Sequence, residues 1–317
     1  MTNNNAQQSN NDIMPCRGRP RCSVLTFVSR ISIVLLLLYA SCISALGQSF
    51  DITANGKHVF CAFQNSFPDK VSEVAFTDDD WTITVGGKIF FWAEGRILSE
   101  VERKKAALFE AHIFYHYPAK VRSPDTFTPQ CIEEIRNMAN PKKRLNTKNY
   151  SYSLHGVLYN GSSLTEVRKM LETVEFLGKR INVHRMIAEP LKNVEADIRN
   201  WEGAEAFIAS LDSVHGFNWR QIEGTRRMSY HSWGIAVDLQ PKKLNEQAIF
   251  WQWEWHRNKN WMLIPLEKRW NPPDPVVEAF ERQGFIWGGK WQLFDNMHFE
   301  YRPELIEFNR IINGINK

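Results

Sequence analysis

The sequence predicts an α+β fold, in which helices and antiparallel strands are both present but do not alternate regularly. Two apolar runs flank Gly86-Gly87 in the pattern of a β-hairpin, and several other segments have the apolar spacing of helices. Regular alternation would instead indicate a doubly wound parallel sheet. With 43% hydrophobic residues among 317, the chain can form a sizeable core, which excludes wholesale disorder.

In the first half of the chain, three segments carry the signals for local structure. Residues 81–85 and 88–92 predict the two strands of the hairpin, joined by a two-residue glycine turn. Residues 99–112 have the apolar spacing of a helix. The polar, breaker-rich stretch 140–149 is typical of a linker.

In the second half, helix-start and helix-stop signals predict three helices. Ser163 and Glu166 form a capping box that opens a helix with apolar residues on one side, expected to stop at Gly178. Residues 190–210 predict a second helix, and Asp274-Pro275 a short third one that Gly284 closes. Between these helices, the apolar run 234–239 predicts a strand.

The charge of the chain argues against nucleic-acid binding. The net charge is +4, but residues 1–48 hold four Arg and one Asp and account for most of it. The remainder is nearly balanced and has no basic excess of the kind that binds nucleic acid. Neither a G-x-G-x-x-G motif nor a P-loop occurs, and the absence of G-x-S-x-G and S-x-x-K argues against serine hydrolases.

Residues 1–48 have the pattern of a signal peptide or membrane anchor. Four Arg precede an apolar run over residues 31–47 that ends in small residues. A run of this length is at the lower limit for spanning a membrane, so a retained tether stays open beside cleavage. Met14 as the start would shorten the basic region, and Cys42 fits a lipoprotein cysteine poorly. We expect an exported protein, periplasmic or associated with the cell envelope.

Only Cys61 and Cys131 lie beyond this leader. In an oxidising compartment they could form one disulfide, or they could be two separate buried thiols, and the sequence leaves both open. Neither belongs to a C-x-x-C pair, which excludes a cysteine-rich zinc site.

Two short segments, 229–238 and 287–300, hold the candidate site residues among aromatic residues and glycines. His231 and Asp238 would lie about 23 Å apart on a straight strand and about 10 Å apart on a helix. They can share a metal only if the chain bends between them, and Trp233-Gly234 can supply that bend. His231 would then lie on a loop, while Asp238 projects from the strand.

The second segment supplies the remaining groups. His298 would be the third ligand, and two His with one carboxylate suit a zinc ion that keeps one position open for water. Asp295 lies three residues before His298, so it can reach that water without being a ligand. A carboxylate in this place can act as a general base, while the metal polarises the scissile carbonyl.

The pattern S-x-H-x-x-G-x-A-x-D followed by D-x-x-H resembles the LAS group of zinc peptidases. That group includes D-alanyl-D-alanine carboxypeptidases, vancomycin-resistance dipeptidases, phage L-alanyl-D-glutamate endolysins and the metal-binding signalling domain of sonic hedgehog. The resemblance covers about residues 180–310. It implies a small antiparallel sheet flanked by helices, one zinc ion on His231, Asp238 and His298, and an acidic base at Asp295. Asp rather than Glu at this position, followed by His-Phe, is more similar to the endolysin branch.

The resemblance also implies an arginine that stabilises the oxyanion or binds a substrate carboxylate. Arg220 is the candidate and Arg227 the reserve, since a second cation beside zinc would stabilise a negatively charged tetrahedral intermediate. The plainer alternative is that Arg220 pairs with Glu223 on a surface turn. Ser229 is expected to support the His231 loop through a backbone hydrogen bond rather than to act as a nucleophile.

Other histidine-containing motifs have plainer interpretations. His112 and His116 have the i, i+4 spacing of a metal pair, but without a third ligand they predict a solvated helix face. The tryptophan-rich run 251–256 is expected to form an aromatic wall or core strand, with glycan or peptide binding as the alternative. His184 and His215 have no metal-like partner at useful spacing and are expected to be structural.

These observations predict three regions: the leader 1–48, an N-terminal region of unknown role over 49–150, and a zinc peptidase domain over 151–317. The expected function is hydrolysis of peptidoglycan stem peptides, with an L-alanyl-D-glutamate endopeptidase slightly favoured over a D-alanyl-D-alanine carboxypeptidase. One alternative is a non-catalytic wall-binding or signalling module with a hedgehog-like zinc site. Another is that residues 49–150 carry the main activity. The oligomeric state stays open.

Overall fold

The computed structural model describes residues 55–77 and 79–314, and it confirms an α+β fold with small antiparallel sheets. The leader predicted over 1–48 lies outside the described residues. Among the helices of the described part, none is long and apolar enough to cross a membrane.

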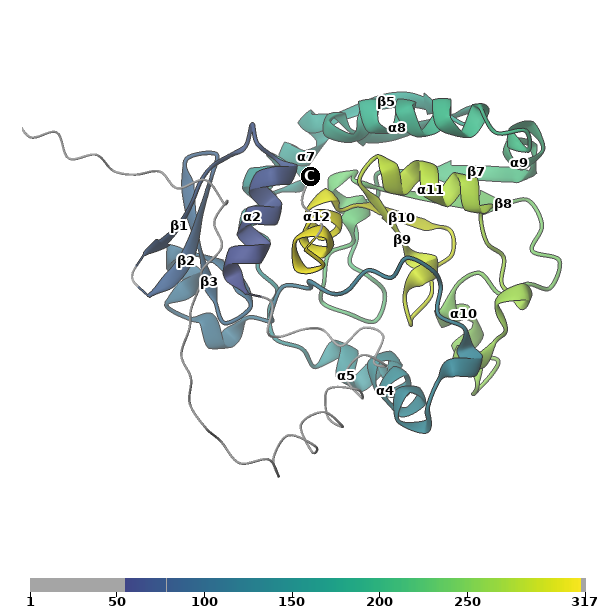
Figure 1. Cartoon of the computed structure of the whole chain (residues 1–317), viewed down its shortest axis with the longest axis horizontal. Coiled ribbons are helices and arrows are strands. Elements are labelled where there is room, and N and C mark those ends of the chain that lie inside the picture. The colour runs from purple at the N-terminus through teal and green to yellow at the C-terminus, as the bar shows by residue number, and fades with distance from the viewer. Residues whose placement is uncertain (1–54, 78, 315–317) are drawn as a thin grey trace, which may run out of the picture. The chain divides into compact units, whose positions relative to one another are not determined.

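Within residues 55–77 and 79–314, the strands form three antiparallel sheets (Figure 1). The first sheet has the order β1-β2-β3-β4, with β1 (Val71–Thr77), β2 (Asp80–Val85), β3 (Lys88–Ala93) and β4 (Arg96–Ser99). The second has the order β7-β8-β10-β9, with β7 (Leu211–His215), β8 (Ala236–Pro241), β10 (His298–Tyr301) and β9 (Phe285–Trp287). The third is the hairpin of β5 (Leu171–Phe176) and β6 (Lys179–His184).

Helices surround these sheets. The α-helices are α2 (Gly56–Ser66), α3 (Glu100–Arg103), α4 (Pro129–Ala139), α5 (Pro141–Leu145), α6 (Ser153–Leu158), α7 (Leu164–Met170), α8 (Arg185–Arg199), α9 (Ala204–Ser210), α10 (Trp251–Trp255), α11 (Asp274–Arg282) and α12 (Pro303–Ile312). Short 3-10 helices are η1 (Ala106–Leu108), η2 (Pro124–Thr126), η3 (Tyr230–Trp233), η4 (Trp261–Leu263), η5 (Leu266–Lys268) and η6 (Gly288–Lys290).

The main hydrophobic core combines side chains from both halves of the chain. Helix α2 lies beside α12, and the Asn65 side chain donates a 2.9 Å hydrogen bond to Glu307 (Figure 1). The rings of Phe114 and Phe308 meet edge to face at 5.3 Å. The boundary between 150 and 151 stays a prediction, but the core itself continues across it.

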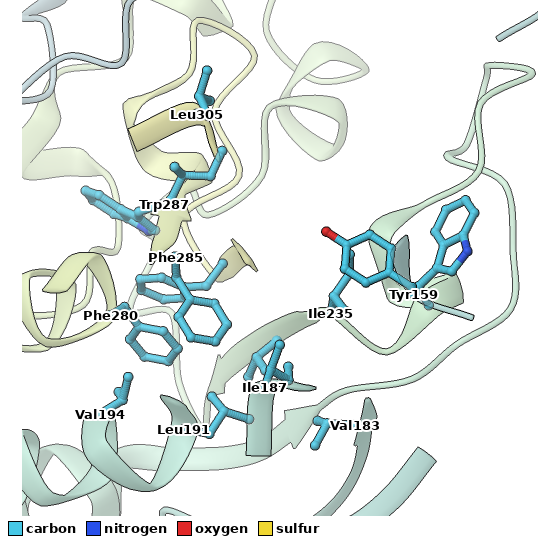
Figure 2. Packing of buried hydrophobic residues seen from close by; sticks show 14 of the residues in the cluster. Tyr159, Val183, Ile187, Leu191, Val194, Ile235, Phe280, Phe285, Trp287 and Leu305 are labelled. Carbon is cyan, nitrogen blue, oxygen red and sulfur yellow. The ribbon is translucent and has the colours of Figure 1, made fainter. Parts of the chain in front are cut away.

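Helix α8 covers the sheet that carries the site. Its buried side chains Ile187, Leu191 and Val194 face Phe280 of α11 and Phe285 of β9 (Figure 2). Burial of one such side chain contributes about 2 kcal/mol. Helix α11 therefore connects α8 with the edge strand β9 of the second sheet.

The predicted hairpin and the predicted short helix are both confirmed. Val85 pairs with Lys88, and Gly86 and Gly87 take the positive φ angles of 54° and 75° that a two-residue turn of this hand requires. Helix α11 begins at Asp274, and Gly284, with φ 88°, follows its end.

The long helix expected over 163–178 is wrong beyond Met170. Ser163 caps α7 as predicted, but the helix ends at Met170 and residues 171–176 form strand β5. Leu177 and Gly178 take φ angles of 51° and 73° and turn the chain into β6. Residues 171–176 therefore pair with residues 179–184 as a strand, although their apolar residues have helical spacing. The β-branched Thr173 and Val174 favour this strand.

Three other local predictions need correction. The helix expected over 99–112 is only α3 and η1, and its second half is extended, where the His112 amide bonds the Gly95 carbonyl at 2.8 Å. The helix expected over 190–210 begins earlier and divides into α8 and α9, because Gly203 precedes a new helix start. The linker expected over 140–149 contains helix α5, capped by the Asn140 side chain.

The two cysteines beyond the leader are both buried, in α2 and α4. Both are described by the structure, and no disulfide joins them. Arg122 donates to the sulfur of Cys131 at 3.8 Å. Of the two open alternatives, the structure therefore shows two separate buried residues.

Candidate metal centre

The chain bends between His231 and Asp238 where the sequence predicted. His231 lies in η3, and the Ser229 hydroxyl accepts a 3.3 Å hydrogen bond from its backbone amide. The turn ends at Gly234, whose φ of 69° is left-handed. A Cβ at this position would lie 2.8 Å from the amide nitrogen of His184, so only glycine fits.

Strand pairing brings the other two predicted ligands together. Asp238 on β8 is directly opposite His298 on the antiparallel strand β10. Directly opposed residues on one face of a sheet have neighbouring side chains. The Nδ1 atom of His298 lies 2.7 Å from Asp238 Oδ1, although 60 residues separate the two along the chain.

The three side chains form one compact cluster. His231 Nε2 lies 3.1 Å from Asp238 Oδ2 and 3.2 Å from His298 Nδ1. Ligand atoms about 2 Å from a tetrahedral zinc are about 3.3 Å from each other, so a slight outward movement would admit the ion. Among the described residues, His231, Asp238 and His298 are the one group of His, Cys, Asp or Glu close enough to hold a metal.

Each histidine is oriented by a second hydrogen bond on its far side. The Nδ1 atom of His231 bonds the carbonyl of Gly216, and His298 Nε2 lies 3.1 Å from the Glu300 carboxylate. Such partners hold a ligating imidazole in the required tautomer and orientation. The sequence interpretation missed Glu300, although the signal was present: residues i and i+2 of a strand project to the same face.

The carboxylates and histidines shift each other's protonation. Burial by itself lowers the pKa of His298, but the Asp238 and Glu300 carboxylates outweigh it and hold that pKa well above its ordinary value. Burial would raise the pKa of Asp238, yet the two histidines hold it far below its usual range. Without a metal, the cluster therefore holds an ionised Asp238 beside a protonated His298.

Asp295 lies at the edge of this cluster. Its amide donates to the Gly288 carbonyl at 3.0 Å, and it forms an isolated antiparallel bridge with Phe250. Its Oδ1 atom is buried without a hydrogen-bond partner. Burial raises the pKa of Asp295 to about 7, while the charges of His298 and Arg220 oppose that rise. A buried carboxylate oxygen with no hydrogen-bond partner is available to accept a proton or to bind a substrate group.

The two predicted arginines have different surroundings. Arg220 is exposed, its guanidinium donates to the Gln221 carbonyl at 3.4 Å, and its charge acts to lower the pKa of Asp295. The ion pairs between described residues include none between Arg220 and Glu223. Arg227, the reserve candidate, instead pairs with Glu110 through an Nε contact of 2.9 Å.

Two of the other histidine predictions have clear outcomes. His112 is buried and lies on an extended segment, where its Nδ1 accepts a 3.0 Å hydrogen bond from Ile97, so the solvated helix face is wrong. His184 is structural as expected: its Nδ1 caps α8, and its Nε2 lies 2.9 Å from the Tyr159 carbonyl.

The tryptophan-rich run is a helix rather than a strand. Trp251 is buried, whereas Trp253 and Trp255 of α10 remain 45% and 36% exposed. The core-strand interpretation is wrong, because residues 251–255 form a helix and do not pair with a neighbouring strand.

Comparison with known families agrees with this geometry. Residues 223–301 match the family model described as D-alanyl-D-alanine carboxypeptidase. Residues 59–114 match a second model, described as Domain of unknown function (DUF8518). No curated protein and no solved structure shows significant similarity to the chain.

The segment that carries the cluster, residues 223–301, is therefore similar to peptidases of the D-alanyl-D-alanine carboxypeptidase family, and its His-Asp-His group could hold a metal ion. The matched residues include all three predicted ligands and Asp295, and they exclude Arg220. The resemblance drawn from the two sequence motifs is confirmed at the level of the family.

Proposed function

We propose that this protein is a zinc-dependent peptidase that hydrolyses the stem peptides of peptidoglycan outside the cytoplasm. The observation that carries the proposal is the buried cluster of His231, Asp238 and His298 beside the unpartnered carboxylate oxygen of Asp295. Two imidazoles and one carboxylate are the ligand set of catalytic zinc sites with an open position. Export is part of the proposal, because this substrate lies outside the cell membrane.

The residues of the chain divide the work between them. A zinc ion on the three ligands would polarise the scissile carbonyl and activate a water for attack. Asp295 accepts the proton of the attacking water through its unpartnered oxygen and then passes it to the leaving amine. Arg220, whose charge reaches Asp295, stabilises the negative charge that develops on the carbonyl oxygen.

The bond that is cut is the finer part of the proposal. Asp295 followed by His298-Phe299 is similar to the L-alanyl-D-glutamate endopeptidase branch, and we favour that bond. The matching family model is described as D-alanyl-D-alanine carboxypeptidase, which makes that bond the competing choice.

Mass spectrometry of purified peptidoglycan, digested with zinc-loaded protein lacking residues 1–48, tests the proposal. New D-glutamate amino termini would support the endopeptidase, and loss of one D-alanine would support the carboxypeptidase. An unchanged digest with zinc bound would contradict both and favour the non-catalytic module.

Glu300→Gln is expected to weaken zinc binding by about 10- to 100-fold, because the neutral amide holds the His298 imidazole less firmly in the required orientation and makes its ligating nitrogen less basic. The Glu300 side chain is 11% exposed, and its carboxylate lies 3.1 Å from Nε2 of that ring. Competition with a chromophoric chelator measures the affinity.

Glu307→Gln is the matched control for this variant. Glu307 is equally buried but bonds Asn65 and Arg310, away from the cluster. Equal zinc affinity in Glu300→Gln and Glu307→Gln would contradict the role given to Glu300.

Zinc binding is expected to release about one proton near pH 7. The pKa of His298 is held well above its ordinary value, so the metal-free ring is protonated there, whereas a ligand must be neutral. The affinity should therefore rise with pH, by up to about tenfold per unit, until the solution passes the pKa of His298. Calorimetry in buffers with different ionisation enthalpies measures the release, and a buffer-independent binding enthalpy would contradict it.

A further inference from the structure

An extended segment from the N-terminal region contacts Trp291, whose ring packs on the ligand His298. Tyr115 is 5% exposed, and its hydroxyl accepts a 2.7 Å hydrogen bond from the indole nitrogen of Trp291. The segment is fixed on α12 by Asn309, whose side chain donates to the Tyr115 carbonyl at 3.0 Å and accepts from the Tyr117 amide at 2.9 Å. The Tyr115 hydroxyl is therefore a fixed point rather than a mobile contact.

Trp291 in turn contacts the candidate site at two places. Its ring centre lies 5.6 Å from that of His298, at an interplanar angle of 53°. Its amide donates to the Gly288 carbonyl at 3.1 Å, the same oxygen that accepts the Asp295 amide at 3.0 Å. If Trp291 moved, both the metal ligand His298 and the predicted base Asp295 would therefore change position.

The packing around Gly288 leaves little freedom for an independent movement. A Cβ on Gly288 would lie 2.6 Å from the Asp295 carbonyl oxygen and 3.1 Å from the Trp291 ring. The indole, the Gly288 turn and the Asp295 backbone are thus packed as one unit. The hydrogen bond to Tyr115 connects the indole of this unit with the N-terminal region.

We propose that Tyr115 is a positioning residue of the peptidase site: by holding the indole of Trp291, it fixes the orientation of His298 and the place of Asp295. The inference rests on the proposed function and extends it, because it gives part of the N-terminal region a role in the reaction. Without the hydroxyl, the part-buried indole N–H loses its acceptor, and the ring must turn to find another acceptor or leave the bond unmade.

The test compares Tyr115→Phe with the wild-type protein after loading with Co²⁺ alone, whose visible absorption bands report the geometry of the ligands. We expect altered bands, and a kcat for a peptidoglycan pentapeptide that falls about fivefold with little change in KM, the effect of one lost hydrogen bond. Trp291→Phe, which also reduces the ring against His298, should change the bands and kcat at least as much. The double variant should add nothing further, because both substitutions remove one interaction.

Tyr117→Phe is the matched control on the same segment. The Tyr117 hydroxyl accepts a 2.8 Å hydrogen bond from the Trp287 amide and donates to Glu281, whereas the Trp291 indole donates to Tyr115. This variant should lose thermal stability and keep the wild-type cobalt spectrum. If it alters the spectrum as much as Tyr115→Phe does, the effect is general loosening and the proposal is overturned.

Two further results would overturn the positioning role. One is a wild-type spectrum and wild-type kcat in Tyr115→Phe, and the other is full additivity in the double variant. Wild-type protein that binds no Co²⁺ would overturn the metal centre itself, so the wild-type spectrum separates failure of the proposed function from failure of this inference.

Discussion

Asp295→Asn is expected to lower kcat by about 10²- to 10⁴-fold, the usual contribution of a general base, and to leave zinc affinity nearly unchanged. The substitution keeps the size and the hydrogen-bonding shape of the side chain but removes its ability to accept a proton. Asp295 is not within the ligand cluster, so the metal should keep all three ligands.

The surroundings of Asp295 explain why one group can have so large an effect. Its Oδ1 atom is buried without a partner, and burial raises its pKa to about 7. A base is most effective when its pKa lies near the working pH. The rate should therefore rise as pH increases through the range in which Asp295 ionises, and a bound cation would move that range lower.

Hydrolysis of peptidoglycan, followed by mass spectrometry, and the zinc content of each variant measure this prediction together. His231→Ala provides the contrast, since it should lose both zinc and turnover. Asp212→Asn, an exposed acid on β7, should change neither. Near-normal turnover in Asp295→Asn would remove the assignment of Asp295 as the base.

A chain limited to residues 151–317 is expected not to fold. The main core contains Phe60, Phe63 and Phe114 from the N-terminal half, packed with side chains of the C-terminal half. Burial of each such ring contributes about 2 kcal/mol, whereas a domain is stable by only about 5–15 kcal/mol. The same core also contains Phe67, Ile83, Phe90, Trp92 and Ile97, and α2 lies beside α12 (Figure 1), so removing residues 55–150 would take away enough of these contacts to exceed this margin.

Circular dichroism and thermal unfolding measure this outcome, with a chain of residues 55–317 as the control. The longer chain should unfold cooperatively, and the shorter chain should show no transition. Addition of a separate fragment 55–150 should restore part of the signal if the lost contacts are the cause. Cooperative unfolding and zinc binding by residues 151–317 alone would contradict the prediction and support an independent domain.

The sequence predicted local structure well where a signal depends on a few adjacent residues. The Gly86-Gly87 turn, the Ser163 cap and the Gly284 stop all follow from backbone preferences, and each is confirmed. The sequence-based prediction failed where a helix and a strand are both compatible with the same residues. Residues 171–176 have apolar spacing that suits a helix, but their pairing with 179–184 is decided by contacts the periodicity does not contain.

The site shows the same division. His231, Asp238, His298 and Asp295 could be found because each motif has a fixed spacing in the chain. Glu300 was missed, although its position two residues after His298 on a strand was readable. The contact between Tyr115 and Trp291 had no local signal, because 176 residues separate them.

By itself, therefore, the sequence determined the α+β class, the family, the candidate metal ligands and the bend at Gly234, all of which depend on residue types at short, fixed spacing. Only the tertiary structure decided how close the ligands come, which carboxylate oxygen is buried without a partner, and that the N-terminal region contacts the site. The physical reason is that these properties arise from strand register and long-range packing, which fix side chains against each other only after the whole core has formed.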